Sequence, residues 1–200
     1  MLIEVWSDVV CPWCYIGKRR LDKAIAMFDH RDQVTVMHRA FQLQPDAQGV
    51  HPTKQHLADK YGVSEAQVEQ MQQNVCDIAT GEGLCYDLSN TVSGNTKDAH
   101  RLLLWAADSG KQDELLKAMY AGYFEQGKSL FTHDDLLALV VDAGLDRDAA
   151  AAGGERAHRH AVLQGPRCAV RRRALRAGQL QRRREPRGAV DEGVAGPAAG

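Results

Sequence analysis

Two cysteines spaced as Cys-x-x-Cys stand where a strand-like segment gives way to a helix-like one, and this feature constrains the fold more than any other. Residues 2–6 are apolar and β-prone apart from one acid, and a polar pair at 7–8 ends the run as turn residues do. Over residues 21–28, apolar side chains recur at helical spacing. The sequence therefore predicts a strand, a turn and a helix, with Cys11 at the helix start and Cys14 one turn inside it.

A cysteine at a helix N-terminus is suited to nucleophilic chemistry. The positive end of the helix dipole and the unpaired N–H groups stabilise a thiolate, and in Cys-x-x-Cys motifs the thiol pKa falls from about 8.5 to roughly 3.5–7. We therefore expect Cys11 to be the exposed, nucleophilic thiol and Cys14 to be the resolving thiol that attacks a mixed disulfide at Cys11. Pro12 fits the first helical turn, and Pro12 and Trp13 are expected to tune the reduction potential.

Two structural interpretations of the same cysteine pair are weaker. Half of a zinc site would need a second close pair, which Cys76, Cys85 and Cys168 do not form, so we predict no metal site. A structural disulfide is typical of secreted proteins, and the first residues show no basic segment of a secretory signal before the strand. A cytoplasmic location is the corresponding expectation.

The segments that follow extend the pattern to an α/β fold. Residues 34–41 are β-branched and roughly alternating, and a strand reached through a helix is expected to lie parallel to the first strand. Residues 42–53 contain two prolines and a glycine and indicate a loop. Helical periodicity then continues for about ninety residues, and Ser64 and Gln67 have the spacing of a capping box.

The cysteine segment resembles a known family. VWSDVVCPWCYIGKRRL at residues 5–21 is similar to the start of the DsbA-like thioredoxin-fold oxidoreductases of the FrnE type, which are related to the 2-hydroxychromene-2-carboxylate isomerases. The similarity continues at residues 39–46, 95–106 and 130–139. It implies an α/β, thioredoxin-like fold with an inserted α-helical domain. It also implies that the chain is a protein-disulfide oxidoreductase.

The resemblance implies partners and further site residues. Thiol or disulfide substrates, proteins or small molecules, are expected, with no cofactor beyond the redox-active disulfide and with glutathione as a candidate co-substrate. His100 and Arg101 match a family motif and are candidates for the substrate groove, although core packing and a surface ion pair are alternative roles. Glutathione-dependent isomerisation of the hydroxychromene-carboxylate type is the alternative reaction, disfavoured because those relatives generally carry serine in place of Cys11. The sequence leaves open whether the chain forms a homodimer.

Charge is unevenly distributed along the chain. Residues 1–154 hold 14 Lys and Arg against 22 Asp and Glu, whereas residues 155–200 hold 11 Arg and 4 acids. The acidic body gives no reason to expect nucleic acid as a partner, and no segment is apolar for long enough to make a membrane a partner. Residues 149–200 contain no aromatic side chain and no sustained period, so we expect them to be disordered or at best irregularly helical.

The composition of this tail also predicts a reading-frame shift between Asp148 and Arg167. In the family the chain returns to a cis-proline beside the cysteines and completes the sheet with two strands and a helix. Here Gly165-Pro166 is the nearest candidate, and residues 167–173 are a poor strand for a sheet centre. Codons permitted for residues 167–177, read without their first nucleotide, can encode GAPFVDGRYG, which looks like the family's proline strand and turn.

The predicted organisation has three parts. Residues 1–50 form the N-terminal β-α-β half of a thioredoxin domain, residues 51–148 form the inserted helical domain, and residues 149–200 form a frameshifted, Arg-, Ala- and Gly-rich tail. The C-terminal part of the thioredoxin half is then missing or scrambled. A non-enzymatic alternative is a damaged, inactive protein whose arginine-rich tail binds anions.

Overall fold

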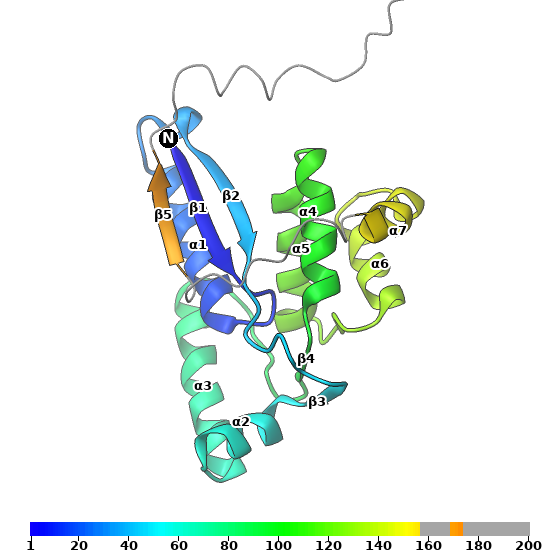
Figure 1. Ribbon diagram of the computed structural model, residues 1–200. Helices are drawn as coiled ribbons and strands as arrows, with labels where there is room; N and C mark the ends of the chain where they lie inside the picture. Colours follow the sequence, from blue (N-terminus) through cyan, green and yellow to red (C-terminus); the bar gives the residue numbers. More distant parts are fainter. Residues whose placement is uncertain (157–168, 174–200) are drawn as a thin grey trace, which may run out of the picture.

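The structure is a computed structural model that describes residues 1–156 and 169–173. Its first part is a three-stranded sheet. The central strand β1 (Leu2–Ser7) has β2 (Thr35–Ala40) parallel on one side and β5 (Ala169–Arg173) antiparallel on the other. Helix α1 (Pro12–Ala26) and the short 3-10 helix η1 (Arg31–Gln33) connect β1 to β2, and α1 lies behind the strands in Figure 1. The parallel β-α-β unit that the sequence predicts is confirmed.

The third strand corrects the expectation for the tail. β5 pairs with β1 from Ala169 opposite Trp6 to Arg173 opposite Leu2. An arginine-rich segment is compatible with this place because β5 is an edge strand of the described sheet, and charged side chains are common on edge strands. Residues 149–156 complete a helix. The expectation is therefore wrong for residues 169–173, which form a strand, and residues 149–156 are helical rather than disordered. Pro166, Cys168 and the other tail residues lie outside the described part of the chain.

Helices and a small hairpin make up the second part of the structure. The helices are α2 (Thr53–Tyr61), α3 (Glu65–Gly81), α4 (Lys97–Asp108), α5 (Gln112–Glu125), α6 (His133–Asp142) and α7 (Arg147–Arg156). β3 (Val50–Pro52) pairs antiparallel with β4 (Val92–Gly94), and α2 and α3 lie between them in sequence. The sequence does not predict these strands, because three residues are too few to show a strand period. None of the described helices combines the length and the apolar content needed to cross a membrane.

Local sequence signals set the start of two of these helices. At α3 the Ser64 hydroxyl accepts the Gln67 N–H at 3.3 Å, and the Gln67 side chain accepts the Ser64 N–H at 2.9 Å. This reciprocal pair is the capping box that the sequence predicts. At α6 the Thr132 hydroxyl accepts the Asp135 N–H at 3.2 Å. Both caps satisfy backbone N–H groups that have no partner within the helix.

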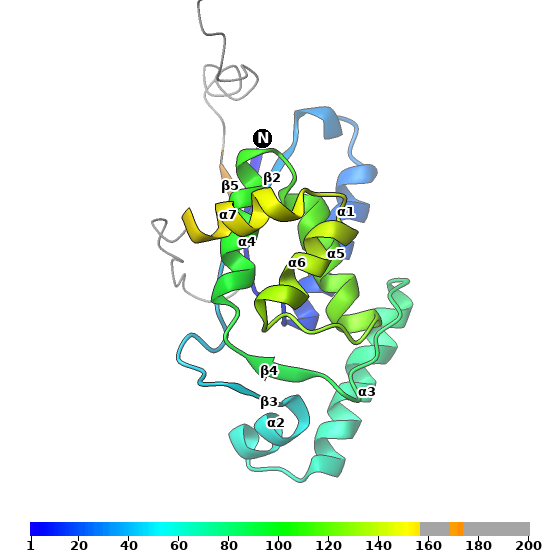
Figure 2. The same ribbon diagram turned by 90° about the vertical axis from the view of Figure 1, so that its right-hand side faces the viewer.

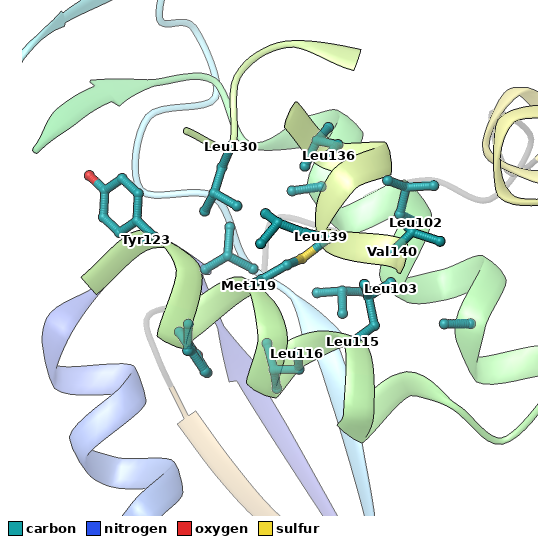
Figure 3. Packing of buried hydrophobic residues seen from close by; sticks show 14 of the residues in the cluster. Leu102, Leu103, Leu115, Leu116, Met119, Tyr123, Leu130, Leu136, Leu139 and Val140 are labelled. Atoms are coloured by element: carbon teal, nitrogen blue, oxygen red, sulfur yellow. The ribbon is translucent and has the colours of Figure 1, made fainter. Parts of the chain in front are cut away.

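The main hydrophobic core lies between α4, α5 and α6 (Figure 3). Gly122 of α5 allows close packing there, since a Cβ at this position would lie 2.5 Å from a methyl carbon of Leu139 in α6. Figure 2 shows α4, α5, α6 and α7 grouped together. The buried core residues include Leu102, Leu103, Leu115, Leu116, Met119, Leu136, Leu139 and Val140.

Polar contacts hold α5 against the outer edge of the sheet. The His38 N–H in β2 donates to Gln112 Oε1 at 3.0 Å, and Gln112 Nε2 donates to the His38 carbonyl at 3.0 Å. Close by, the buried Lys18 ammonium of α1 pairs with Asp22 and with Asp113 of α5, each at 2.8 Å. The side chain of Gln112 thus takes the place of a neighbouring strand along β2.

Candidate active site

The turn between β1 and α1 places Cys11 at the start of the helix. Cys11 is the N-cap residue, with φ −93° and ψ 112°, and Pro12 is the first helical residue. The Cys11 N–H donates to the Asp8 carbonyl at 3.2 Å, and the Cys11 carbonyl accepts the N–H groups of Cys14 and Tyr15 at 3.0 and 3.3 Å. The first turn of α1 contains no acidic residue, so no charge within that turn offsets the dipole that favours a thiolate.

Cys11 is more buried than the sequence suggests. Only 9% of Cys11 is exposed, whereas Cys14 is half-buried, so the expectation of an exposed Cys11 is wrong. The cause is tertiary, because segments distant in sequence surround the helix start. Cys11 nevertheless lines a pocket, while Cys14 packs partly against the main core. Of the two sulfurs, Cys11 is therefore the one on the pocket side.

This pocket has a volume of about 310 Å³ and a mainly apolar lining. Pro12 and Trp13 border it together with Cys11. The opposite walls come from the inserted segment and from the loop after β2. Their lining residues include Leu43, Gln44, Thr53, His56, Leu57, Lys60, Tyr61, Met71, Gln72, Val75, Tyr123 and Phe124.

Aromatic rings from the inserted segment pack directly beneath the cysteine turn. The Tyr86 hydroxyl donates to the Pro12 carbonyl at 2.8 Å, and the Tyr120 ring stacks on Tyr15 with centroids 4.8 Å apart. The Tyr15 hydroxyl in turn donates to Glu125 at 3.0 Å. The pKa of Tyr120 is raised well above its usual value, first by burial and then by the nearby Cys14. Burial likewise raises the pKa of Tyr86, so both hydroxyls stay protonated as donors.

Asp8 and His100 form a buried pair beside the same turn. His100 Nε2 lies 3.2 Å from Asp8 Oδ1 and 3.1 Å from the Phe41 carbonyl oxygen. Both oxygens are acceptors, so Nε2 carries the proton and is the donor. The second Asp8 oxygen accepts the Leu43 N–H at 2.7 Å. The pair fastens the β1–α1 turn to α4 and to the segment after β2.

Neither residue of the family motif in α4 lines the pocket at Cys11. His100 is 2% exposed and points into the contact with Asp8, and Arg101 forms an ion pair with Asp98 one turn earlier. His100 is therefore a buried packing residue and Arg101 belongs to a surface ion pair, which are the two alternative roles considered from the sequence. Adjacent residues on a helix point in different directions, so a shared motif does not bring both side chains to one groove.

The other described cysteines, Cys76 and Cys85, are free thiols. Cys76 is half-buried in α3, and burial raises the pKa of its thiol. Cys85 is exposed. Within residues 1–156 and 169–173, no three His, Cys, Asp or Glu side chains gather closely enough to hold a metal ion. The absence of a structural zinc stays a prediction for the purified protein.

Comparisons with known proteins cover both parts of the structure. A family model described as DSBA-like thioredoxin domain matches residues 2–168. No curated protein matches the chain. Among solved structures, a probable DsbA oxidoreductase from Streptomyces coelicolor is 41% identical with a TM-score of 0.74, and the alignment covers 79% of this chain and 69% of that one.

Two more distant structures share the fold. The cytosolic disulfide reductase DsbM from Pseudomonas aeruginosa is 17% identical with a TM-score of 0.56, over 80% of this chain and 74% of DsbM. A 2-hydroxychromene-2-carboxylate isomerase is 14% identical with a TM-score of 0.52, over 78% of this chain and 71% of the isomerase. Because the family match runs from β1 through the cysteine turn and the helical segment and covers most of the chain, the chain belongs to the DSBA-like thioredoxin domain family.

Proposed function

We propose that this protein is a thiol–disulfide oxidoreductase in which Cys11 is the nucleophile and Cys14 the resolving thiol. The observation that carries the proposal is the position of Cys11, which caps the N-terminus of α1 and borders the pocket while Cys14 lies one turn inside. A thiolate at that place is stabilised by the helix dipole and meets whatever occupies the pocket. Pro12 and Trp13, the residues between the two thiols, tune the potential.

The chemistry balances within the cysteine pair and a substrate disulfide. The Cys11 thiolate attacks one sulfur, the substrate S–S bond breaks, and the departing thiolate takes up a proton. Cys14, after losing its proton, then attacks the Cys11 sulfur and releases the second substrate thiolate, leaving a Cys11–Cys14 disulfide. The substrate gains two electrons and the enzyme loses two. The reverse sequence oxidises a dithiol substrate.

We also propose a cytoplasmic setting for this chemistry. A cytoplasmic, FrnE-type enzyme would use glutathione or another thiol to return the Cys11–Cys14 disulfide to its dithiol form. The relative DsbM, described as a cytosolic disulfide reductase and also solved with glutathione, is consistent with this setting. Two cysteines at the helix start favour disulfide exchange over the isomerisation chemistry of the hydroxychromene-carboxylate relatives.

Replacing the resolving thiol tests the proposal. In a Cys14→Ser variant incubated with a small disulfide, mixed disulfide should accumulate on Cys11, because the second attack is lost. Peptide mass mapping locates the adduct. The exposed Cys85 provides the matched control, since Cys85→Ser should leave wild-type turnover unchanged. A Cys14→Ser protein that carries no adduct on Cys11 would show that Cys11 does not act as the nucleophile.

A further inference from the structure

The pocket beside Cys11 gathers apolar side chains that face solvent. Trp13, Leu43, Tyr61 and Met71 are each 43–54% exposed, and they are four of the nine large hydrophobic side chains exposed in the described part of the chain. They come from α1, the loop after β2, α2 and α3, so the clustering is a product of the fold. Exposed apolar side chains gathered around a hollow indicate a ligand with an apolar part.

The lining also carries a single fixed charge. Lys60 borders the pocket, its Nζ lies 5.7 Å from the centroid of the Tyr61 ring, and it takes part in none of the ion pairs between described residues. No aspartate or glutamate is among the described residues that line the pocket. On a body with 22 acids against 14 bases, this wall is locally positive. An anionic group on the ligand fits it.

We propose that this pocket binds small disulfides that carry an aromatic group and a carboxylate. The proposal rests on the disulfide exchange proposed above and adds the chemical class of its substrate. A volume of about 310 Å³ is the size of a small-molecule site. The aromatic group lies against the apolar wall of Trp13, Tyr61 and Met71, the carboxylate faces Lys60, and one sulfur faces Cys11. The Cys11 thiolate then breaks the S–S bond and expels an aromatic thiolate.

The charge part is tested with two aromatic disulfides, dithiobis(nitrobenzoate), which carries carboxylates, and dithiodipyridine, which is neutral. The rate of modification at Cys11 is read in the full chain carrying Cys14→Ser, where the adduct persists, by mass spectrometry after acid quenching. Lys60→Gln should slow the carboxylated probe about threefold, as expected for one exposed charge, and leave the neutral probe unchanged. The loss should shrink at high salt. Each probe is compared only with itself, so differences in intrinsic reactivity cancel.

Lys54→Gln is the matched control for charge. Lys54 lies on the same helix and the substitution changes net charge equally, but Lys54 pairs with Glu69 and does not line the pocket. It should leave both rates at the wild-type value. Equal slowing of both probes by Lys60→Gln, or equal effects of Lys60→Gln and Lys54→Gln, would overturn the assignment of the carboxylate site.

The apolar part is tested on α3. Met71→Ser should slow both aromatic probes about threefold, because part of the apolar wall is lost, and should not slow dithiodiglycolate, which has no ring. Ile78→Ser is the control, since Ile78 is an exposed residue of the same helix outside the pocket. Indistinguishable effects of the two variants would refute the aromatic site. Failure of every probe to modify Cys11 in the Cys14→Ser protein would instead refute the proposed oxidoreductase function.

Discussion

The hydroxyl of Tyr86, from the inserted segment, donates a hydrogen bond of 2.8 Å to the carbonyl of Pro12, which lies between Cys11 and Cys14 in the sequence. Hydrogen bonds to one side of a peptide group polarise it and strengthen the donor on its other side. The N–H that follows the Pro12 carbonyl belongs to the first turn of α1, whose positive end favours a Cys11 thiolate. The inserted helical segment therefore contacts the cysteine turn directly, through Tyr86, and also lines the pocket.

A Tyr86→Phe variant should raise the pKa of Cys11 and lower the free energy of unfolding by about 1 kcal/mol, the usual contribution of one hydrogen bond. Thiolate absorbance against pH measures the first effect and urea unfolding the second. Tyr123→Phe is the control, because the Tyr123 hydroxyl donates to the Val92 carbonyl at 2.6 Å and not to a carbonyl of the cysteine turn. It should destabilise similarly without moving the Cys11 pKa. The same pKa in both variants would mean that the Tyr86 bond is only structural.

His38 predicts a loss of stability in acid. Burial, followed by the neighbouring Lys18 ammonium, lowers the pKa of His38 from 6.5 to about 4, and neither ring nitrogen has a hydrogen-bond partner among the described residues. Between these two values the unfolded chain binds more protons than the folded one. The free energy of unfolding should therefore fall by on the order of 3 kcal/mol as the pH drops from about 6.5 to about 4.

A His38→Phe variant should flatten this pH profile, measured by urea unfolding at each pH, while keeping most of the buried volume. The exposed His133 supplies the comparison, and His133→Gln should reproduce the wild-type slope. An unchanged slope in His38→Phe would show that other groups cause the acid sensitivity.

Met119 lies fully buried between α5 and α6 (Figure 3). Met119→Ala should lower the free energy of unfolding by about 3 kcal/mol, because it removes apolar contacts and leaves a cavity. Met27, which is 79% exposed, gives the matched substitution, and Met27→Ala should change stability by less than about 0.5 kcal/mol. Similar losses in both variants, measured by thermal unfolding, would contradict the placement of the core.

The reading frame of the tail remains a prediction that sequencing of the gene decides. We expect a one-nucleotide shift between Asp148 and Arg167, and a restored frame should encode a proline in place of Ala169. The restored protein should have a higher midpoint of thermal unfolding than the present chain, because the tail would supply strand and helix residues with apolar side chains. An undisturbed frame through this interval would show the prediction wrong.

Much of the fold is predictable because its signals are local. The strand before Cys11, the Pro12 start of α1, and the caps at Ser64 and Thr132 each depend on a few neighbouring residues. β5 could not be predicted, because residues 169–173 lack an apolar strand pattern and pair through their backbone with β1. Strand formation depends on the neighbouring strand more than on local propensity, so an edge strand of this kind is hard to predict from its own residues.

The site shows the same division. The positions of Cys11 and Cys14 at the start of α1 follow from the motif, whereas the pocket that Cys11 borders has walls that come from α2 and α3. Tyr86 and Lys60 could not be recognised as site residues from the sequence, because an aromatic residue beside a cysteine and a lysine on an amphipathic helix are common features. Only the tertiary fold brings the Tyr86 hydroxyl to Pro12 and Lys60 to the pocket.

A redox titration of the full protein against mixtures of reduced and oxidised glutathione, read by mass spectrometry, tests the central claim most directly. We predict a single two-electron transition in which Cys11 and Cys14 lose two hydrogens and become one intramolecular disulfide, ahead of any change at Cys76 or Cys85. Cys11→Ser should abolish the transition. Oxidation beginning at Cys76 or Cys85, or a stable glutathione adduct on Cys11 that Cys14 does not resolve, would contradict the assignment of the pair.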